Sequence, residues 1–279
     1  MMWRRSLAAI SLFLSGICNV HAQARAIEDD QQLFNWYYAS VYGTGVYSSD
    51  DRTVGILQAP FTFSLRESSE EQWGLRFNLP ISFGFYDFDF DEIAQGNLPS
   101  HVNTLSVVPG IEFEKRVVPR WLLRPYVSAG YGWELGGDES AWIYDVGARS
   151  RFRLGTDRGT VFSLVNWLSL AGYYPSGGSH QPLGLFATGV DIEVPTGLTF
   201  SDRPLFVSVL PIYYYYFRKL GFPEISDADN TVREEGEFAI SLFVREPFKF
   251  LGFDVDRIGV AIRTTADITG VRIFTSLPF

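Results

Sequence analysis

An alternation of apolar and polar residues with a period of two constrains this chain more than any other feature of its sequence. From Trp73 to Phe85 the odd positions are all apolar, and the even positions between them are polar, glycine or proline. Because successive side chains of a β-strand point to opposite faces, this segment has one apolar face and one polar face. The alternation returns over 104–114, 121–134 and 142–154, which predicts an all-β protein.

The length of these runs distinguishes a membrane barrel from a sandwich, whose strands hold about 5–6 residues. The run from Trp73 to Phe85 covers roughly 40 Å at ~3.3 Å per residue, or roughly 30 Å along the membrane normal at a tilt of ~40°. Arg149, Arg151 and Arg153 share one face with glycine, which favours a water-filled interior over an open surface. The sequence therefore predicts a single transmembrane antiparallel up-and-down β-barrel with its apolar side chains facing lipid.

Turn-forming segments divide the chain into about 12 strands, an even number that brings both ends of a barrel to the periplasmic side. The longest connections, 86–101 and 218–236, then fall on the outer side, and the periplasmic connections include 195–204 and 247–256. The expected strands are 33–47, 53–65, 72–86, 102–115, 121–135, 142–154, 160–174, 183–194, 205–217, 237–246, 257–265 and 271–279.

The first 22 residues have the pattern of a cleaved export signal. Arg4 and Arg5 precede an apolar stretch over 7–20, and Ala22 completes a small-residue cleavage site. We expect residues 1–22 to be removed and residues 23–279 to form the barrel domain. The single cysteine lies in the signal, and a net charge of −9 excludes nucleic acid as a partner because phosphate binding needs a basic surface.

Tryptophans provide a second indication of a membrane. Amphipathic rings gain from lying at the headgroup level, so a barrel carries them at its strand ends. Of the six tryptophans after residue 22, only Trp167 falls in the middle of an expected strand. The predicted aromatic girdle consists of Trp36, Trp73, Trp121, Trp133 and Trp142.

The last expected strand carries a further pattern, because Val271, Ile273, Leu277 and Phe279 alternate with polar residues or proline and the chain stops on phenylalanine. This strand resembles the signal that the barrel assembly machinery of bacterial outer membranes reads, which implies that machinery as a partner. The whole mature chain resembles bacterial outer-membrane β-barrels.

Within that group, the chain is most similar to the translocator barrel of autotransporters, standing alone without a passenger. The Trp36–Tyr38 and Leu75–Phe85 segments carry this resemblance, and only residues 23–32 precede the first expected strand. The resemblance implies the outer membrane of a Gram-negative bacterium, with its lipids and lipopolysaccharide as surroundings. The sequence leaves the oligomeric state open.

Charged residues on the polar faces form the candidate site, because charges on the lipid face at mid-depth cost about 2–4 kcal/mol each. These charges either pair across strands and fill a closed lumen, or line a narrow pore that selects small anions. The main interpretation is a structural or passive transport role, and an anion-biased channel is the alternative. The predicted lumen-lining charges are Arg76, Glu112, Glu114, Arg124, Glu134, Asp145, Arg149, Arg151 and Arg153.

A lipid hydrolase at the barrel rim is the enzyme alternative, because a Ser–His pair activates a serine nucleophile. His101 and His180 each follow a serine, but neither context has a His-x-Ser phospholipase pattern. The acidic segment 87–92 fails as a calcium loop because Glu92 stands where such a loop needs glycine. We expect no enzyme activity, no metal and no cofactor.

Two further segments carry structural predictions. The expected outer loops are acidic, and we interpret their carboxylates as solvated surface groups. Tyr213–Tyr216 are expected to alternate between an outer girdle and inner stacking. The acidic loop residues are Asp50, Asp51, Asp138, Glu139, Asp227, Asp229, Glu234 and Glu235.

Overall fold

The computed structural model describes residues 43–49, 52–69, 71–86, 103–178, 180–221, 231–250, 253–265 and 268–276. None of these segments is a helix long and apolar enough to cross a membrane. Across the described ranges the strands are β1 (Gly45–Ser49), β2 (Arg52–Arg66), β3 (Gly74–Tyr86), β4 (Thr104–Val107), β5 (Gly110–Val118), β6 (Trp121–Glu134), β7 (Ser140–Asp157), β8 (Thr160–Pro175), β9 (Gln181–Phe200), β10 (Arg203–Gly221), β11 (Thr231–Phe250), β12 (Phe253–Thr264) and β13 (Ile268–Phe274).

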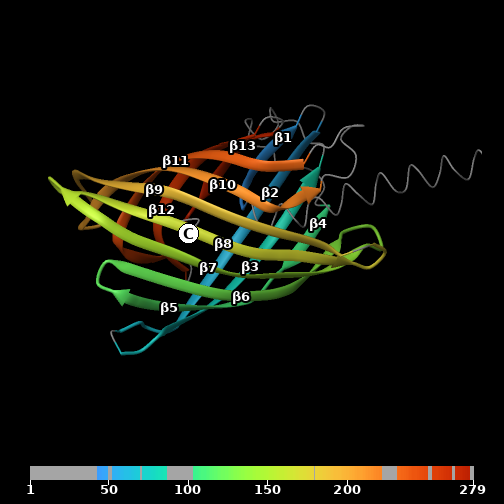
Figure 1. Ribbon diagram of the computed structural model, residues 1–279, viewed down its shortest axis with the longest axis horizontal. Coiled ribbons are helices and arrows are strands. Elements are labelled where there is room, and N and C mark those ends of the chain that lie inside the picture. The colour runs from blue at the N-terminus through green and yellow to red at the C-terminus, as the bar shows by residue number, and fades with distance from the viewer. Residues whose placement is uncertain are drawn as a thin grey trace, which may run out of the picture.

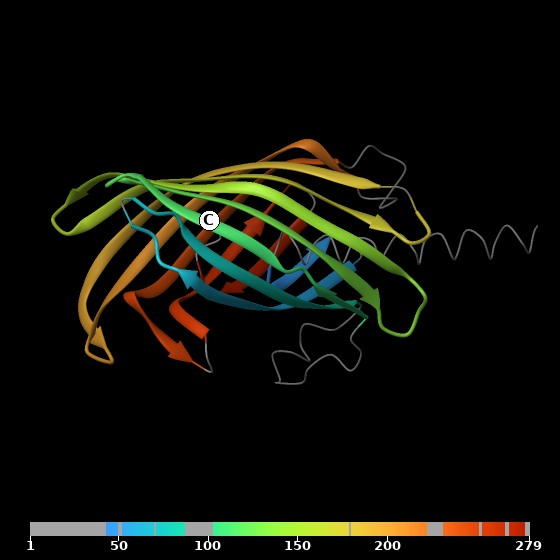
Figure 2. The same ribbon diagram turned by 90° about the horizontal axis from the view of Figure 1, so that it is seen from below.

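These strands form one closed antiparallel sheet (Figures 1 and 2). Apart from β4 and β5, which do not pair with each other, each strand pairs with its neighbours in sequence, and the ring closes because β1 pairs with both β2 and β13. β4 and β5 occupy a single place in the ring, since both lie between β3 and β6. The prediction of an all-β barrel of about 12 strands is therefore confirmed.

The break between β4 and β5 corrects the prediction of one continuous strand over 102–115. It falls at Val108 and Pro109, where proline has no backbone N–H to donate to the sheet. The neighbouring strands still bond to the break, because Val108 N donates to Pro80 O at 3.2 Å and Ala129 N donates to Pro109 O at 3.0 Å. The interruption therefore leaves the wall of the barrel closed.

The outward face of the barrel is apolar. On β12, Ile258, Val260 and Ile262 are more than half exposed, whereas Arg257 and Arg263, which flank this run, are buried inside. A water-soluble protein does not expose a continuous apolar belt of this kind, and lipid tolerates only a closed set of backbone hydrogen bonds. This is the architecture of bacterial outer-membrane barrels.

The two ends of the barrel differ in their connections. One end, here called the turn end, includes the two-residue connections 119–120, 158–159 and 201–202, while the opposite loop end has the long connection 87–103. Because such barrels have short periplasmic turns and long outer loops, we assign the turn end to the periplasm.

Several predicted connections were too long. β9 runs to Phe200 and β10 begins at Arg203, so 195–204 contains only a tight turn at Ser201 and Asp202, both with positive φ. Similarly, β11 and β12 take up most of 247–256, and β10 and β11 extend into 218–236. Proline and glycine within these stretches favoured turns, although Phe248, Phe250, Phe253 and Val255 keep the period of two.

The seam between β1 and β13 is closed by a tyrosine lying against glycines. The Tyr47 ring occupies the space that a Cβ at Gly270 would need, and its hydroxyl group crowds the Cβ position of Gly45. The hydroxyl also donates to Gly43 O at 3.2 Å. Glycine at these positions therefore allows the first and last described strands to approach each other.

Some predictions lie outside the described residues. They concern the export signal over 1–22, Trp36, the acidic segment 87–92, His101, Leu277 and Phe279. On β13, Val271 and Ile273 point outward and are about half exposed, while Arg272 between them is buried inside.

Candidate functional site

The loop-end half of the barrel interior is packed. Ile143, Tyr173, Leu185, Leu210 and Tyr214, from four neighbouring strands, belong to one buried apolar cluster. Tyr214 and Tyr216 of the tyrosine run point inward, and Tyr213 and Tyr215 point outward. The interior charge that solvent can reach therefore lies in the turn-end half.

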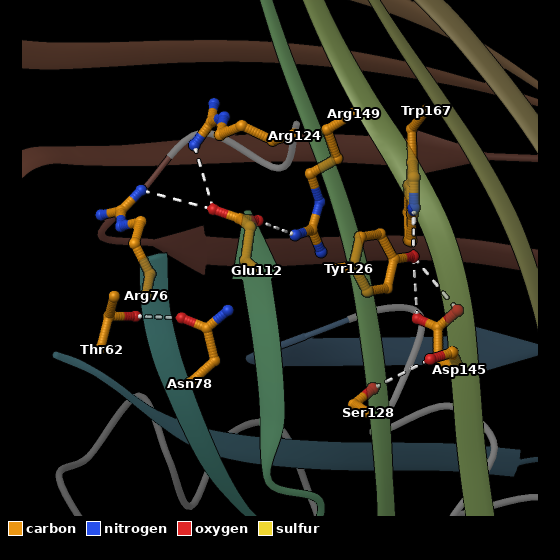
Figure 3. A network of polar contacts seen from close by, with 10 residues as sticks. All are labelled: Thr62, Arg76, Asn78, Glu112, Arg124, Tyr126, Ser128, Asp145, Arg149 and Trp167. Carbon is orange, nitrogen blue, oxygen red and sulfur yellow. Dashed lines mark hydrogen bonds and ion pairs between the residues drawn. The ribbon is translucent and has the colours of Figure 1, made fainter. Parts of the chain in front are cut away.

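Three arginines converge on one carboxylate in that half (Figure 3). Glu112 on β5 accepts a hydrogen bond from Arg149 at 2.7 Å, and its other oxygen lies 3.5 Å from Arg76 and 3.7 Å from Arg124. Strand register produces this arrangement, because Arg76 is the partner of Glu112 and Arg124 is the partner of Arg149. We call these four residues the Glu112 cluster.

An aromatic platform fixes the guanidinium of Arg149. This group lies 4.3 Å from the ring centroid of Tyr126 and 5.6 Å from that of Trp167, which are cation–π distances. The Tyr126 hydroxyl donates to Asp145 and accepts from Trp167 Nε1 at 2.7 Å (Figure 3). Asp145 also accepts from Ser169 at 2.6 Å. Trp167 thus lies in mid-strand because it faces the interior.

A second group of charges continues from the Glu112 cluster toward β9 and β12. Arg151 on β7 reaches past β8 to Asp191 at 3.0 Å and Glu193 at 2.5 Å. Arg257 on β12 approaches Glu193 at 3.9 Å and donates to Ser241 at 2.7 Å. The ion pairs of Arg151 and Arg257 with carboxylates of β9 join strands that are not neighbours in the sheet.

Carboxylates and guanidiniums of these networks differ in their access to solvent. The side chains of Glu112, Asp191 and Glu193 are 4%, 0% and 7% exposed. Those of Arg76, Arg124, Arg149 and Arg151 are 32%, 17%, 25% and 26% exposed, whereas that of Arg257 is buried at 3%. Solvent inside the turn-end half therefore meets guanidinium groups, behind which the carboxylates lie.

A third group of charges, on β11–β13, is closed to solvent. Arg263 pairs with Glu235 at 2.5 Å, and Arg272 lies 3.1 Å from Glu237. The side chains of all four residues are at most 8% exposed. We call them the Glu235–Glu237 cluster.

Two tyrosines complete this cluster from β10. Tyr216 donates to Glu235 at 2.6 Å, and Tyr214 donates to Glu237 at 3.0 Å. The Arg263 guanidinium lies 4.0 Å from the Tyr214 ring centroid and also donates to the Tyr216 hydroxyl at 2.8 Å. Acid, base and phenol thus pair in the packed half, through hydrogen bonds at Glu235 and through charge between Arg272 and Glu237.

The interpretation of Glu235 as a solvated loop residue was wrong. β11 begins at Thr231, so Glu235 points into the barrel. The sequence does contain the signal for this, because Glu235, Glu237, Ala239 and Ser241 alternate with residues that include Phe238 and Ile240. This run of charged and small residues begins directly after an acidic connection, and Glu235 was therefore assigned to that connection.

The remaining predicted charges lie apart from the Glu112 cluster. Glu114 accepts from Ser68 at 2.8 Å near the turn end. Glu134 lies at the loop end, 3.4 Å from the backbone N of Glu139. Arg153 is exposed at the turn end.

The described tryptophans of the predicted girdle all lie on the outer surface near strand ends. Trp73 and Trp121 lie at the turn end, and Trp133 and Trp142 at the loop end. Trp133 and Trp142 each contact Tyr131 with ring centroids 5.1 Å apart. His180, a candidate for the hydrolase, contacts Tyr144 and Tyr174, and within the described ranges no serine or carboxylate contact is recorded for it.

The residues that the structure describes contain no group of three histidine, cysteine, aspartate or glutamate side chains placed to hold a metal ion. No family model and no curated protein matches the sequence. Among solved structures, the chain is similar to the KdgM porin in complex with disordered oligogalacturonate. The two are 10% identical, the TM-score is 0.41, and the match covers 82% of this chain and 93% of that chain.

Proposed function

We propose that this protein is an outer-membrane barrel, exported by the signal over 1–22, that conducts small anions along Arg76, Arg124, Arg149 and Arg151. The observation that carries the proposal is the difference in exposure between the two kinds of charge. The guanidiniums are 17–32% exposed and their carboxylate partners at most 7%. An ion that enters the turn-end half meets positive charge first.

This arrangement suits passage rather than tight binding. Conduction requires sites that attract an ion strongly enough to enter and weakly enough to leave. Each guanidinium here is already engaged with Glu112, Asp191 or Glu193, so it has only part of its charge and hydrogen-bonding capacity left for a solute. Arg149 is also fixed by Tyr126 and Trp167, which keeps it from following the solute.

The packed loop-end half limits what can pass. Inward side chains there, such as Ile143, Leu185 and Tyr214, are buried. A 12-stranded barrel lies between side-chain-filled 8-stranded barrels and open 16-stranded porins. We therefore expect a small conductance, restricted to inorganic and other small anions.

A second candidate is the solitary structural barrel, similar to a translocator without a passenger. The same packed half favours it, because buried Tyr214, Tyr216 and the Glu235–Glu237 cluster leave their part of the interior filled with side chains. This candidate predicts a folded barrel that conducts no ions. The hydrolase alternative receives no such support, since His180 is engaged with two tyrosines.

Electrical recording from the refolded mature protein in a planar bilayer distinguishes the candidates, after heat-modifiable gel migration has shown that the barrel is folded. In a KCl gradient we expect a reversal potential that indicates preference for chloride. Arg149→Gln and Arg151→Gln should reduce that preference. Arg218→Gln is the matched control, because Arg218 is exposed and is paired with Gly184, which shares the outward face of β9 with Phe186. Silence from a folded barrel, or unchanged selectivity in both lumen variants, would contradict the proposal.

A further inference from the structure

A bulge in β10 changes the face of the sheet on which Arg218 lies. Leu210, Ile212, Tyr214 and Tyr216 point inward at every second position, and continuation would place Arg218 in the lumen. The pairing with β9 instead shifts between Tyr216 and Arg218. A bulge sets two residues against one on the neighbouring strand and can redirect a side chain.

The register shows the direction that Arg218 takes. Tyr216 is paired with Leu185, which is buried in the lumen, but Arg218 is paired with the next residue, Gly184, on the outward face. The ring of Phe217 lies against Gly184, where a Cβ would collide with it. The bulge thus turns both Phe217 and Arg218 toward the outside, and Arg218 is exposed.

A histidine is held beside this position at the loop end. His180 stacks on Tyr174, with ring centroids 4.0 Å apart and an interplanar angle of 9°. Its Nε2 lies 2.8 Å from the Tyr144 hydroxyl. Tyr144 reaches it across β8 at Gly172, its register partner, which has no side chain in the way. In the tautomer whose Nε2 accepts from Tyr144, Nδ1 carries a proton and can donate to a ligand.

Arg218 and this aromatic group lie close together. Arg218 is paired with Gly184 on β9. Pro182, two residues along that strand, is paired with Gly172 and therefore lies across β8 from Tyr144. No ion pair of Arg218 is recorded within the described ranges of the chain. The surrounding surface is aromatic, since Trp142 contacts Tyr131 and is the register partner of Tyr174. Aromatic rings of this kind mark the depth of the lipid headgroups.

We propose that Arg218 and His180 form a binding site for the phosphate group of a membrane lipid in the leaflet at the loop end. A guanidinium binds phosphate through paired hydrogen bonds, and the imidazole N–H adds a third donor. Tyr144, Tyr174 and Trp142 provide the apolar surface against which the lipid's hydrophobic part packs. The site lies on the outer surface, so it does not depend on whether the lumen conducts.

Native mass spectrometry of the folded protein in detergent tests this site, with diphosphoryl lipid A as the probe. The comparison lipid is the same molecule with its phosphates removed. We expect the wild-type protein to retain one lipid in preference to the dephosphorylated form. Arg218→Gln should weaken retention roughly tenfold, because a charge-assisted hydrogen bond is lost, and His180→Gln roughly threefold.

Arg233→Gln is the matched control, because Arg233 is also exposed at the loop end but lies on β11. Heat-modifiable migration confirms that each variant is folded, and Arg218→Lys should restore part of the retention. Equal retention of the two lipids would overturn the proposal. So would an Arg218→Gln variant as retentive as Arg233→Gln, or inorganic phosphate that competes as well as the lipid does.

Discussion

The Glu112 cluster and the Glu235–Glu237 cluster are made from the same chemical groups but differ in what covers them. In the first, three arginines from β3, β6 and β7 gather around one carboxylate and remain partly exposed to the interior. In the second, each carboxylate has its own arginine and tyrosine, and nothing is exposed beyond 8%. A buried ion pair stabilises a protein only when its charged groups have close partners. A surface that attracts ions, in contrast, needs charge that solvent can reach.

This difference separates stability from function within one lumen. The Glu235–Glu237 cluster should determine whether the barrel folds, and the Glu112 cluster should determine which ions enter it. Substitutions in the two clusters must then have effects of different kinds.

Arg263→Gln should destabilise the barrel most. It leaves Glu235 buried without its cation, and breaking one partner of a buried ion pair costs about 3–5 kcal/mol. Urea unfolding followed by tryptophan fluorescence in lipid vesicles measures the loss. Arg153→Gln, at an exposed position, should change the free energy of unfolding by less than about 0.5 kcal/mol. Equal stability of the two variants would show that the buried pairing does not support the fold.

Gly270→Ala should have the next largest effect, because the added Cβ collides with the Tyr47 ring at the closing seam. Forcing an extra carbon into a packed site costs about 1–3 kcal/mol. The same unfolding experiment measures it, and a double-mutant cycle with Tyr47→Ala isolates the contact. The two substitutions together should destabilise less than their separate effects added. Strict additivity would mean that the collision is relieved elsewhere.

The Glu112 cluster should instead respond in ion selectivity, with opposite signs for its two kinds of charge. Glu112→Gln removes the carboxylate and leaves the guanidiniums, so preference for anions should rise. Arg149→Gln removes a guanidinium, so the preference should fall. Reversal potentials in a KCl gradient measure both, at equal protein orientation. Shifts of the same sign would contradict the assignment of charge to the conducting surface.

The sequence predicts those features of the fold and of the candidate site that depend on the pattern within one strand. The period of two gives the strands and their faces, and it places Arg76, Glu112 and Arg149 on the same inner face. Register then sets Arg76 opposite Glu112 and Arg149 opposite Arg124. It fails at Arg218, since one bulge between Tyr216 and Arg218 reverses the face without changing the composition. Bulges and breaks are set by neighbouring strands, which a single strand's sequence does not encode.

Burial of charge is equally hidden from the sequence. Glu235 and Glu112 are both glutamates on polar faces, and only the tertiary structure shows that one has tyrosine and arginine caps while the other is surrounded by partly exposed arginines. Contacts such as Arg151 with Asp191, which skip a strand, depend on side-chain length and barrel curvature. The sequence therefore does not distinguish a filled lumen from an arginine-lined pore.

The smallest expected effect distinguishes the ring of Tyr126 from its hydroxyl group. Tyr126→Phe keeps the aromatic face 4.3 Å from the Arg149 guanidinium but removes the hydrogen bonds to Asp145 and Trp167. We expect the free energy of unfolding to fall by about 1 kcal/mol. Anion preference should decrease less than in Arg149→Gln, because the cation stays in place and only its support loosens. If Tyr126→Phe abolished selectivity as completely as Arg149→Gln, the hydroxyl network itself would have to carry the selectivity, and the arginines would lose their assigned role.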